Sequence, residues 1–175
     1  MVLLVQYTLI FASVLALVAL GGCFSEHSGV INIGLEGIMV MGALGGALAM
    51  KFLPATTPGI VLFILIVLAS VLVGMAFSLL LGFAAIHFNA DQTLVGTALN
   101  LMGTAAAVVI VRAINVAENP DNVSSTVVYR QAKQVFLVKI GDFEFNWFML
   151  IIVLAIIASH IVLYRTKFGL RLCAC

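Results

Sequence analysis

Five long apolar stretches, separated by short polar segments, make up most of this chain. They cover residues 2–22, 30–50, 60–86, 92–114 and 147–164. A helix needs about 20 consecutive, mostly apolar residues to cross the hydrocarbon core of a bilayer. The pattern therefore predicts an all-α, polytopic transmembrane helical bundle with about five membrane segments.

The polar segments predict short turns and one long loop. Pro54, Pro58 and Gly59 favour a turn between the second and third stretches. Residues 115–146 form the long polar segment, with β-prone pieces near 127–129 and 135–140. We expect this segment to be a surface loop that can form a short β hairpin.

Composition leads to the same class of protein and excludes others. Hydrophobic residues make up 64% of the chain, charged residues 9%, and the mean hydropathy is +1.28. These values predict an integral membrane protein that forms a single transmembrane domain over residues 1–175. The net charge of +1 and the lack of a basic run argue against a nucleic-acid partner. The cysteines have no metal-ligand or disulfide spacing, and we expect no metal, no cofactor and no catalytic residue.

Small residues at intervals of four predict close helix packing. Gly42 and Gly46 have this spacing within the second stretch. Four residues of the third stretch repeat it, namely Ser70, Gly74, Ser78 and Gly82. Such small-xxx-small patterns let two helix backbones approach closely in lipid.

Polar side chains inside the apolar stretches are candidates for a solute path. A charge at the middle of a membrane helix costs about 2.5–3.5 kcal/mol or more, so Glu36 is expected to have a role. Asn32 lies one helical turn before it if residues 30–50 are helical. In the fourth stretch, polar and small residues share one helical face, namely Thr93, Gly96, Thr97, Asn100, Gly103 and Thr104. The predicted path or gate is lined by Asn32, Glu36, Thr93, Thr97 and Asn100.

Structural interpretations of the same residues stay open. The polar face of the fourth stretch can pack against another helix, and Glu36 can be a buried acid bonded to backbone or neighbouring side chains. The stretch 30–50 can cross the bilayer or re-enter on the same side. Counting basic residues also opposes a cytoplasmic tail: the tail has Arg165, Lys167 and Arg171, and the alternate side has Lys51, Arg112, Arg130, Lys133 and Lys139.

Three ordered motifs carry a family resemblance. They are SEHSGVINIGLEGIMVMGA, HFNADQTLVGTALNL and TKFGLRLCAC. Together they resemble the permease subunit of bacterial ABC importers for nucleosides and simple sugars, in the branched-chain amino acid and ribose permease superfamily. The resemblance covers about residues 21–175 and implies a multi-pass protein of the cytoplasmic (inner) membrane. Family members are nearly twice as long and have arginine where Cys173 stands, so we expect an amino-terminal fragment.

The resemblance also implies partners and a coupling element. The partners would be an ABC ATPase subunit, a second permease subunit of the same or another kind, an extracytoplasmic substrate-binding lipoprotein and membrane lipid. Residues 115–146 would be extracytoplasmic, and 165–175 would begin a cytoplasmic coupling loop. Its contacts with the ATPase would come from Thr166, Lys167, Phe168, Gly169 and Arg171. ATP would be hydrolysed by the partner, since no G-x-x-x-x-G-K-[ST] motif occurs in this chain.

Two other classes of protein compete with an importer subunit. A proton-coupled secondary transporter could use Glu36, His87 and Asp91 as a relay. A membrane scaffold without transport activity would need only the small-residue patterns. Bound ATPase, ion-driven uptake in liposomes, or neither, would distinguish the three.

Overall fold

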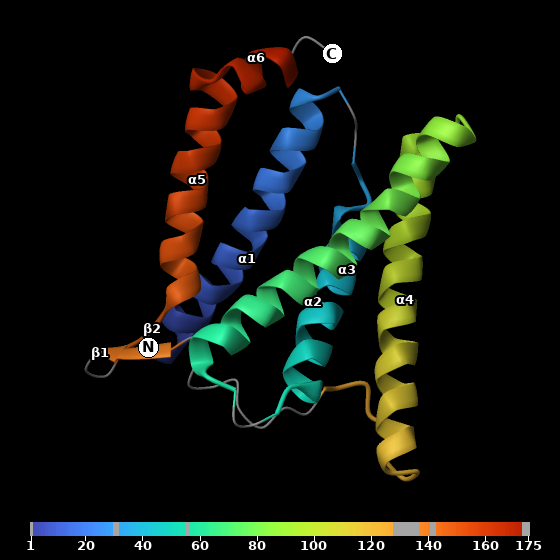
Figure 1. The fold of residues 1–175 in the computed structure, drawn as a ribbon, viewed down its shortest axis with the longest axis vertical. Helices are drawn as coiled ribbons and strands as arrows, with labels where there is room; N and C mark the ends of the chain where they lie inside the picture. The colour runs from blue at the N-terminus through green and yellow to red at the C-terminus, as the bar shows by residue number, and fades with distance from the viewer. Residues whose placement is uncertain (1, 30–31, 55–56, 128–136, 141–142, 173–175) are drawn as a thin grey trace. The chain divides into compact units, whose positions relative to one another are not determined.

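The computed structural model contains two compact groups of helices. It describes residues 2–29, 32–54, 57–127, 137–140 and 143–172. Unit 1 combines Met1–Asn32 with Phe136–Cys175, and unit 2 is Ile33–Val135. Each unit is built from elements that pack on one another (Figure 1).

Unit 1 pairs the first and last long helices of the chain. Its elements are α1 (Val2–His27), β1 (Leu137–Ile140), β2 (Phe143–Asn146), α5 (Trp147–Arg165) and α6 (Lys167–Leu172). Strand β2 contacts α1 and leads directly into α5. At the other end, the ring of His27 meets the ring of Tyr164 edge-on, with centroids 6.1 Å apart. Helices α1 and α5 therefore run in the same direction, from the hairpin to α6.

Unit 2 is a three-helix group with a glycine-rich helix in the middle. Its elements are α2 (Leu35–Phe52), α3 (Gly59–His87) and α4 (Gln92–Glu118). Helix α2 packs on both α3 and α4. Phe77, Leu81 and Leu99 form a buried cluster, with Ile38 of α2 packed against it. The apolar core thus joins all three helices.

Local sequence explains where the helices of unit 2 begin. Asp91 caps α4, because its carboxylate accepts a hydrogen bond of 2.8 Å from the Thr93 N–H. Pro58 precedes the first residue of α3, and proline has no N–H to lose at a helix start. Asn89 adopts a left-handed conformation with φ +48°, which asparagine tolerates better than most residues. It reverses the chain between α3 and α4.

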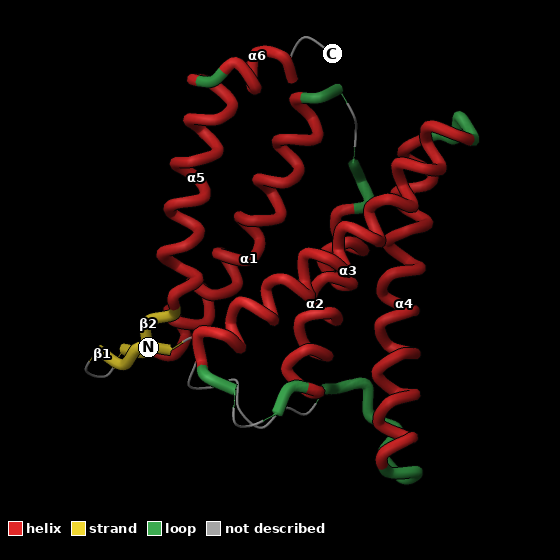
Figure 2. The backbone as a smooth tube through the Cα atoms, in the orientation of Figure 1, coloured by secondary structure: helices red, strands yellow, loops and turns green. Residues whose placement is uncertain are grey.

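The helical bundle predicted from hydropathy is confirmed. Four described helices are long and apolar enough to cross a membrane, and α5 supplies a shorter apolar helix (Figure 2). The hairpin pairs Leu137–Ile140 with Phe143–Asn146, and Lys139 lies opposite Glu144. Its first strand lies within the β-prone piece near 135–140, and its second strand, Phe143–Asn146, comes after that piece. Residues 128–129 of the expected piece lie outside the described residues.

Candidate substrate path and coupling helix

The backbone before and at the start of α2 lies directly against α4. A methyl group built at Gly37 would be 2.6 Å from the Leu99 carbonyl oxygen, and one at Gly103 would be 3.0 Å from the Gly37 Cα. At Gly96, a methyl group would be 2.9 Å from the backbone nitrogen of Gly34. Glycine at these positions leaves room for backbone to touch backbone. This face of α4 therefore packs directly against the start of α2.

Asn100 bonds the backbone on both sides of the start of α2. Its Oδ1 accepts a hydrogen bond of 2.7 Å from the Gly37 N–H, and its Nδ2 donates one of 2.8 Å to the Ile33 carbonyl. The first N–H groups of a helix have no partner within the helix, and an unsatisfied backbone group in lipid costs several kcal/mol. Asn100 therefore stabilises a non-helical entry into α2.

Replacing Asn100 by alanine is expected to destabilise the protein. It leaves the Gly37 N–H and the Ile33 carbonyl without these partners, at about 1–3 kcal/mol for the part-buried Gly37 N–H. Thr97→Ala, three residues away on the same helix, is the control, because Thr97 is exposed and should change stability by at most about 0.5 kcal/mol. Thermal unfolding in detergent measures both variants. Equal unfolding temperatures would contradict the bridging role of Asn100.

One expectation about the second stretch is wrong, and one of the interpretations left open is not met. Helix α2 begins at Leu35, so Asn32 does not share a helical face with Glu36. Glycine at position 34 disfavours helix, and Asn100 holds this backbone in another shape. Glu36 is exposed in the first turn of α2, so it is not a buried structural acid in this chain. A carboxylate at that position interacts favourably with the helix dipole.

Asn32 has an unusual environment of its own. Its Oδ1 is buried and has no hydrogen-bond partner among the described residues. Buried side-chain oxygens are usually bonded. The Asn32 Oδ1 can therefore accept a hydrogen bond from a donor outside the described part of the chain.

The predicted polar face of α4 is divided between packing and surface. Gly96 and Gly103 are buried against α2, whereas Thr93 and Thr97 are exposed. The Thr97 hydroxyl donates to the Leu94 carbonyl in its own helix at 2.9 Å. Asn100 is thus the predicted path residue of α4 that the structure brings to α2, while the two threonines remain on the outer surface of unit 2.

The small residues of α2 and α3 meet over part of their length. The Ser70 hydroxyl donates to the Gly42 carbonyl at 2.6 Å. A methyl group at Gly46 would be 2.8 Å from the Ser70 Oγ, and one at Gly74 would be 3.9 Å from the Gly42 Cα. The two backbones are therefore close from Gly42 to Gly46.

The contact does not extend along the whole predicted stripe. The Ser78 hydroxyl donates to Met75 in its own helix, and no described atom lies within 4 Å of a methyl group built at Gly82. The close approach of the two helices is therefore not seen at Gly82. Sequence spacing also missed Gly45, where a methyl group would be 2.8 Å from Val73 Cγ2.

A polar network joins the ends of α2 and α4. Lys51 Nζ lies 3.0 Å from the Glu118 carboxylate and donates to Asn115 Oδ1 at 3.3 Å. Asn115 is 3% exposed, and its Nδ2 donates to the carbonyls of Ser124 and Thr126 at 2.9 and 3.0 Å. The network anchors the loop after α4. Sequence reasoning missed it, because Lys51 and Asn115 are 64 positions apart.

Helix α6 folds back against the end of α5. The Thr166 hydroxyl donates to the Val162 carbonyl at 2.6 Å. Gly169 is buried, and a methyl group built there would overlap the backbone of Leu163. The turn between the two helices therefore requires glycine at position 169.

The outer side of α6 is basic and partly apolar. Phe168 and Leu170 are 58% and 73% exposed, and Lys167 and Arg171 are also exposed. Within unit 1, α6 lies across the end of α5 (Figure 1). Four of the five predicted coupling residues thus lie in one short helix, with a buried glycine and an exposed cationic side, and Thr166 directly precedes it.

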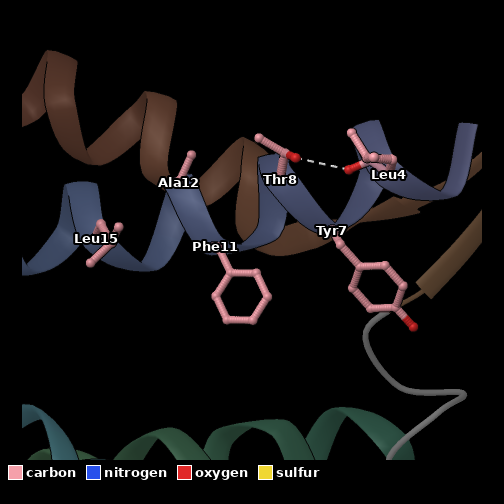
Figure 3. A pocket seen from close by; sticks show the side chains of 6 residues that line it. All are labelled: Leu4, Tyr7, Thr8, Phe11, Ala12 and Leu15. Atoms are coloured by element: carbon pink, nitrogen blue, oxygen red, sulfur yellow. Dashed lines mark hydrogen bonds between the residues drawn. The ribbon is translucent and has the colours of Figure 1, made fainter. Parts of the chain in front are cut away.

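A shallow groove follows one face of α1. Figure 3 shows its lining side chains, which are Leu4, Tyr7, Thr8, Phe11, Ala12 and Leu15. The lining is almost entirely apolar, and the Thr8 hydroxyl already donates to the Leu4 carbonyl at 2.8 Å. Such a surface suits lipid or another helix, and it offers little to a solute rich in hydroxyl groups.

Comparison with known proteins identifies the family. The profile of the family described as "Branched-chain amino acid transport system / permease component" matches residues 4–175. The chain belongs to this permease family. The family resemblance found in the three motifs is therefore confirmed, and the chain is a multi-pass membrane permease component. No solved structure matches it significantly.

Two relatives of this permease match along most of the chain. The guanosine ABC transporter permease protein NupQ of Bacillus subtilis is 36% identical over 97% of the chain and 54% of its own length. The nucleoside ABC transporter permease protein NupC of Lactococcus lactis is 33% identical over the same shares. A putative glucose ABC transporter permease protein of Haloferax volcanii, TsgC13, is 37% identical over 58% of the chain and 29% of its own length. The chain spans about half the length of NupQ and NupC.

Proposed function

We propose that this permease forms part of the membrane path of an ABC importer for nucleosides. The observation that carries the proposal is the match to NupQ and NupC, which extends over 97% of the chain in both cases. The match to a glucose permease covers 58% of the chain, so nucleosides are preferred to simple sugars. The importer would lie in the cytoplasmic membrane.

The start of α2 is the best candidate for the path or its gate. Non-helical backbone at membrane depth is tolerated where it is buried in protein or lines a cavity, and interrupted helices form the binding sites of many transporters. Asn100 holds this entry through its amide, so its role is positioning. The exposed Glu36 would bond nucleoside hydroxyl and amine groups.

Helix α6 is the proposed contact with an ATP-hydrolysing subunit. Its exposed Lys167 and Arg171 would meet acidic groups of that partner, and Phe168 would add an apolar contact. The buried Gly169 fixes the helix against α5, so a push on α6 would move α5. A second permease subunit and an extracytoplasmic substrate-binding lipoprotein would complete the importer, with lipid around the exposed helix faces.

Uptake by intact cells tests the proposed substrate. Cells that carry the gene and cells from which it has been deleted are given radiolabelled guanosine, uridine or ribose. Deletion is expected to lower nucleoside uptake at least tenfold and to leave ribose uptake unchanged. Unchanged uptake of both nucleosides would contradict the proposal.

The energy source separates an importer from its rival. Collapse of the proton gradient at constant cellular ATP should leave nucleoside uptake in place, and depletion of ATP should abolish it. The opposite result would favour a proton-coupled transporter that uses Glu36, His87 and Asp91.

A further inference from the structure

Arg112 carries a positive charge on the outer face of a membrane helix. It lies six residues before α4 ends at Glu118, and it is exposed. Its neighbours Val111 and Asn115 are only 5% and 3% exposed, so they belong to the face of α4 that packs within unit 2. A charged side chain in a membrane helix is costly and usually has a partner. Arg112 therefore needs an anionic group outside this packed face.

The length of α4 places Arg112 near the edge of the hydrocarbon core. The helix has 27 residues, or about 40 Å at 1.5 Å per residue, and Arg112 lies about 9 Å before its end. The hydrocarbon core is about 30 Å thick, so a helix that extends equally beyond both surfaces has Arg112 about 4 Å inside the boundary. The long arginine side chain covers this distance. The guanidinium group is therefore expected at the level of the lipid headgroups.

Unit 2 does not supply a carboxylate for Arg112. Its four acidic residues are Glu36, Asp91, Glu118 and Asp121. The first lies in the first turn of α2, and the second caps the start of α4, about 32 Å from Arg112 along the helix. Among the residues that the structure describes, no carboxylate oxygen lies within 4 Å of the Arg112 guanidinium nitrogens. The counter-ion must then come from elsewhere.

The other charges at this end of α2 and α4 compensate each other. The Lys51 side chain is 10% exposed, and its Nζ lies 3.0 Å from the Glu118 carboxylate. The pair is neutral as a whole, and Glu118 is already engaged. The positive charge of Arg112 is thus not offset by this pair.

Three exposed valines surround Arg112 on the same helical face. Val108, Val109 and Val116 are 41%, 64% and 40% exposed, and they lie three or four positions from Arg112, where side chains are neighbours on a helix. The surface therefore joins one cation to an apolar patch. A phospholipid has the matching chemistry, because its phosphate suits the planar fork of arginine and its acyl chain suits the valines.

We propose that Arg112, Val108, Val109 and Val116 bind an anionic phospholipid. The Arg112 guanidinium donates two hydrogen bonds to the phosphate oxygens, and the first part of an acyl chain packs on the valines. A free phosphate ion would gain nothing from the valines, which is why a lipid is the occupant. A zwitterionic headgroup brings its own ammonium group to compete for the phosphate, so phosphatidylglycerol is preferred to phosphatidylcholine. The site does not depend on which solute the permease transports.

Tryptophan quenching by brominated lipid tests the site where it lies. In the full-length permease, Trp147 and any further native tryptophan are replaced by phenylalanine, and a single tryptophan is introduced by Val109→Trp. The protein is placed in vesicles of phosphatidylglycerol and phosphatidylcholine, one of which carries bromine on its acyl chains. Because bromine quenches tryptophan on contact, exchanging the brominated lipid gives the relative affinity of the two lipids at position 109.

We expect phosphatidylglycerol to be preferred about fivefold at position 109, which corresponds to about 1 kcal/mol for one arginine near anionic lipid. Arg112→Met should abolish the preference, and Arg112→Lys, which keeps the charge but loses the fork, should retain part of it. Leu101→Trp is the matched control probe. Leu101 is 74% exposed and lies about 16 Å earlier along α4, so neither lipid should be preferred there.

Three results would overturn the lipid site. They are equal affinity for the two lipids at position 109 with Arg112 in place, an unchanged preference in Arg112→Met, and quenching by neither lipid at position 109 while position 101 is quenched. The last result would show that a protein segment covers Arg112. Quenching at position 101 and the unfolding temperature report whether Arg112→Met is folded. If it is not, the comparison of positions 109 and 101 with Arg112 in place still decides.

Discussion

Gly37→Ala is expected to reduce the stability of the permease more than any other alanine substitution in α2. Its methyl group would be 2.6 Å from the Leu99 carbonyl oxygen. The methyl carbon is bonded directly to one helix backbone and the oxygen belongs to the other, so no side-chain rotation can separate them. Overpacking of this kind costs about 1–3 kcal/mol and sometimes more. The same change would also disturb the Gly37 N–H bond to Asn100. Thermal unfolding of the purified protein in detergent measures the effect.

Gly82→Ala is the matched control for this prediction. It is the same substitution inside a long helix, but no described atom lies within 4 Å of the new methyl group. Alanine is favoured over glycine in a helix by about 1 kcal/mol, so stability should stay constant or rise. Gly42→Ala, with 3.3 Å to the Ser70 carbonyl oxygen, should give an intermediate result. Equal effects at Gly37 and Gly82 would refute the backbone contact between α2 and α4.

The positions of the helices could be predicted from the sequence because hydropathy and turn residues act locally. The apolar stretches 60–86 and 92–114 begin within one residue of α3 and α4, which follow Pro58 and Asp91. The start of α2 could not be predicted in this way. Its backbone is held by Asn100, which is 63 and 67 positions away from Gly37 and Ile33, so the helix is shortened by a tertiary contact.

The dependence on tertiary contacts also explains what the sequence patterns missed at the candidate site. A spacing of four finds small residues but does not tell which of them face a neighbour. The pattern included Ser78, whose hydroxyl bonds within its own helix, and Gly82, where an added methyl group would meet no other element, and it left out Gly45. The pairing of Lys51 with Asn115 and Glu118 has no local signature. These contacts are determined by tertiary packing between helices, which a pattern within one helix does not show.

Gly169→Ala is expected to separate ATP hydrolysis from transport. The buried Gly169 packs on the backbone of Leu163, so even one methyl group must push α6 away from α5. Since α6 is the proposed contact with the ATPase, its displacement should lower nucleoside uptake at least tenfold. The helices of unit 2 are remote in sequence from this turn. We therefore do not expect Gly169→Ala to lower the unfolding temperature as Gly37→Ala should.

The measurement compares three quantities in membrane vesicles that hold the assembled importer. They are nucleoside uptake, ATP hydrolysis, and crosslinking of a cysteine at Phe168 to the ATPase subunit. Gly169→Ala should reduce uptake and crosslinking together, while ATP hydrolysis continues and the amount of folded permease stays normal. Gly82→Ala should leave all three unchanged. Normal uptake together with undiminished crosslinking would contradict this prediction. The predicted displacement of α6 would then affect neither transport nor the contact with the ATPase, so the position of α6 against α5 would not matter for coupling.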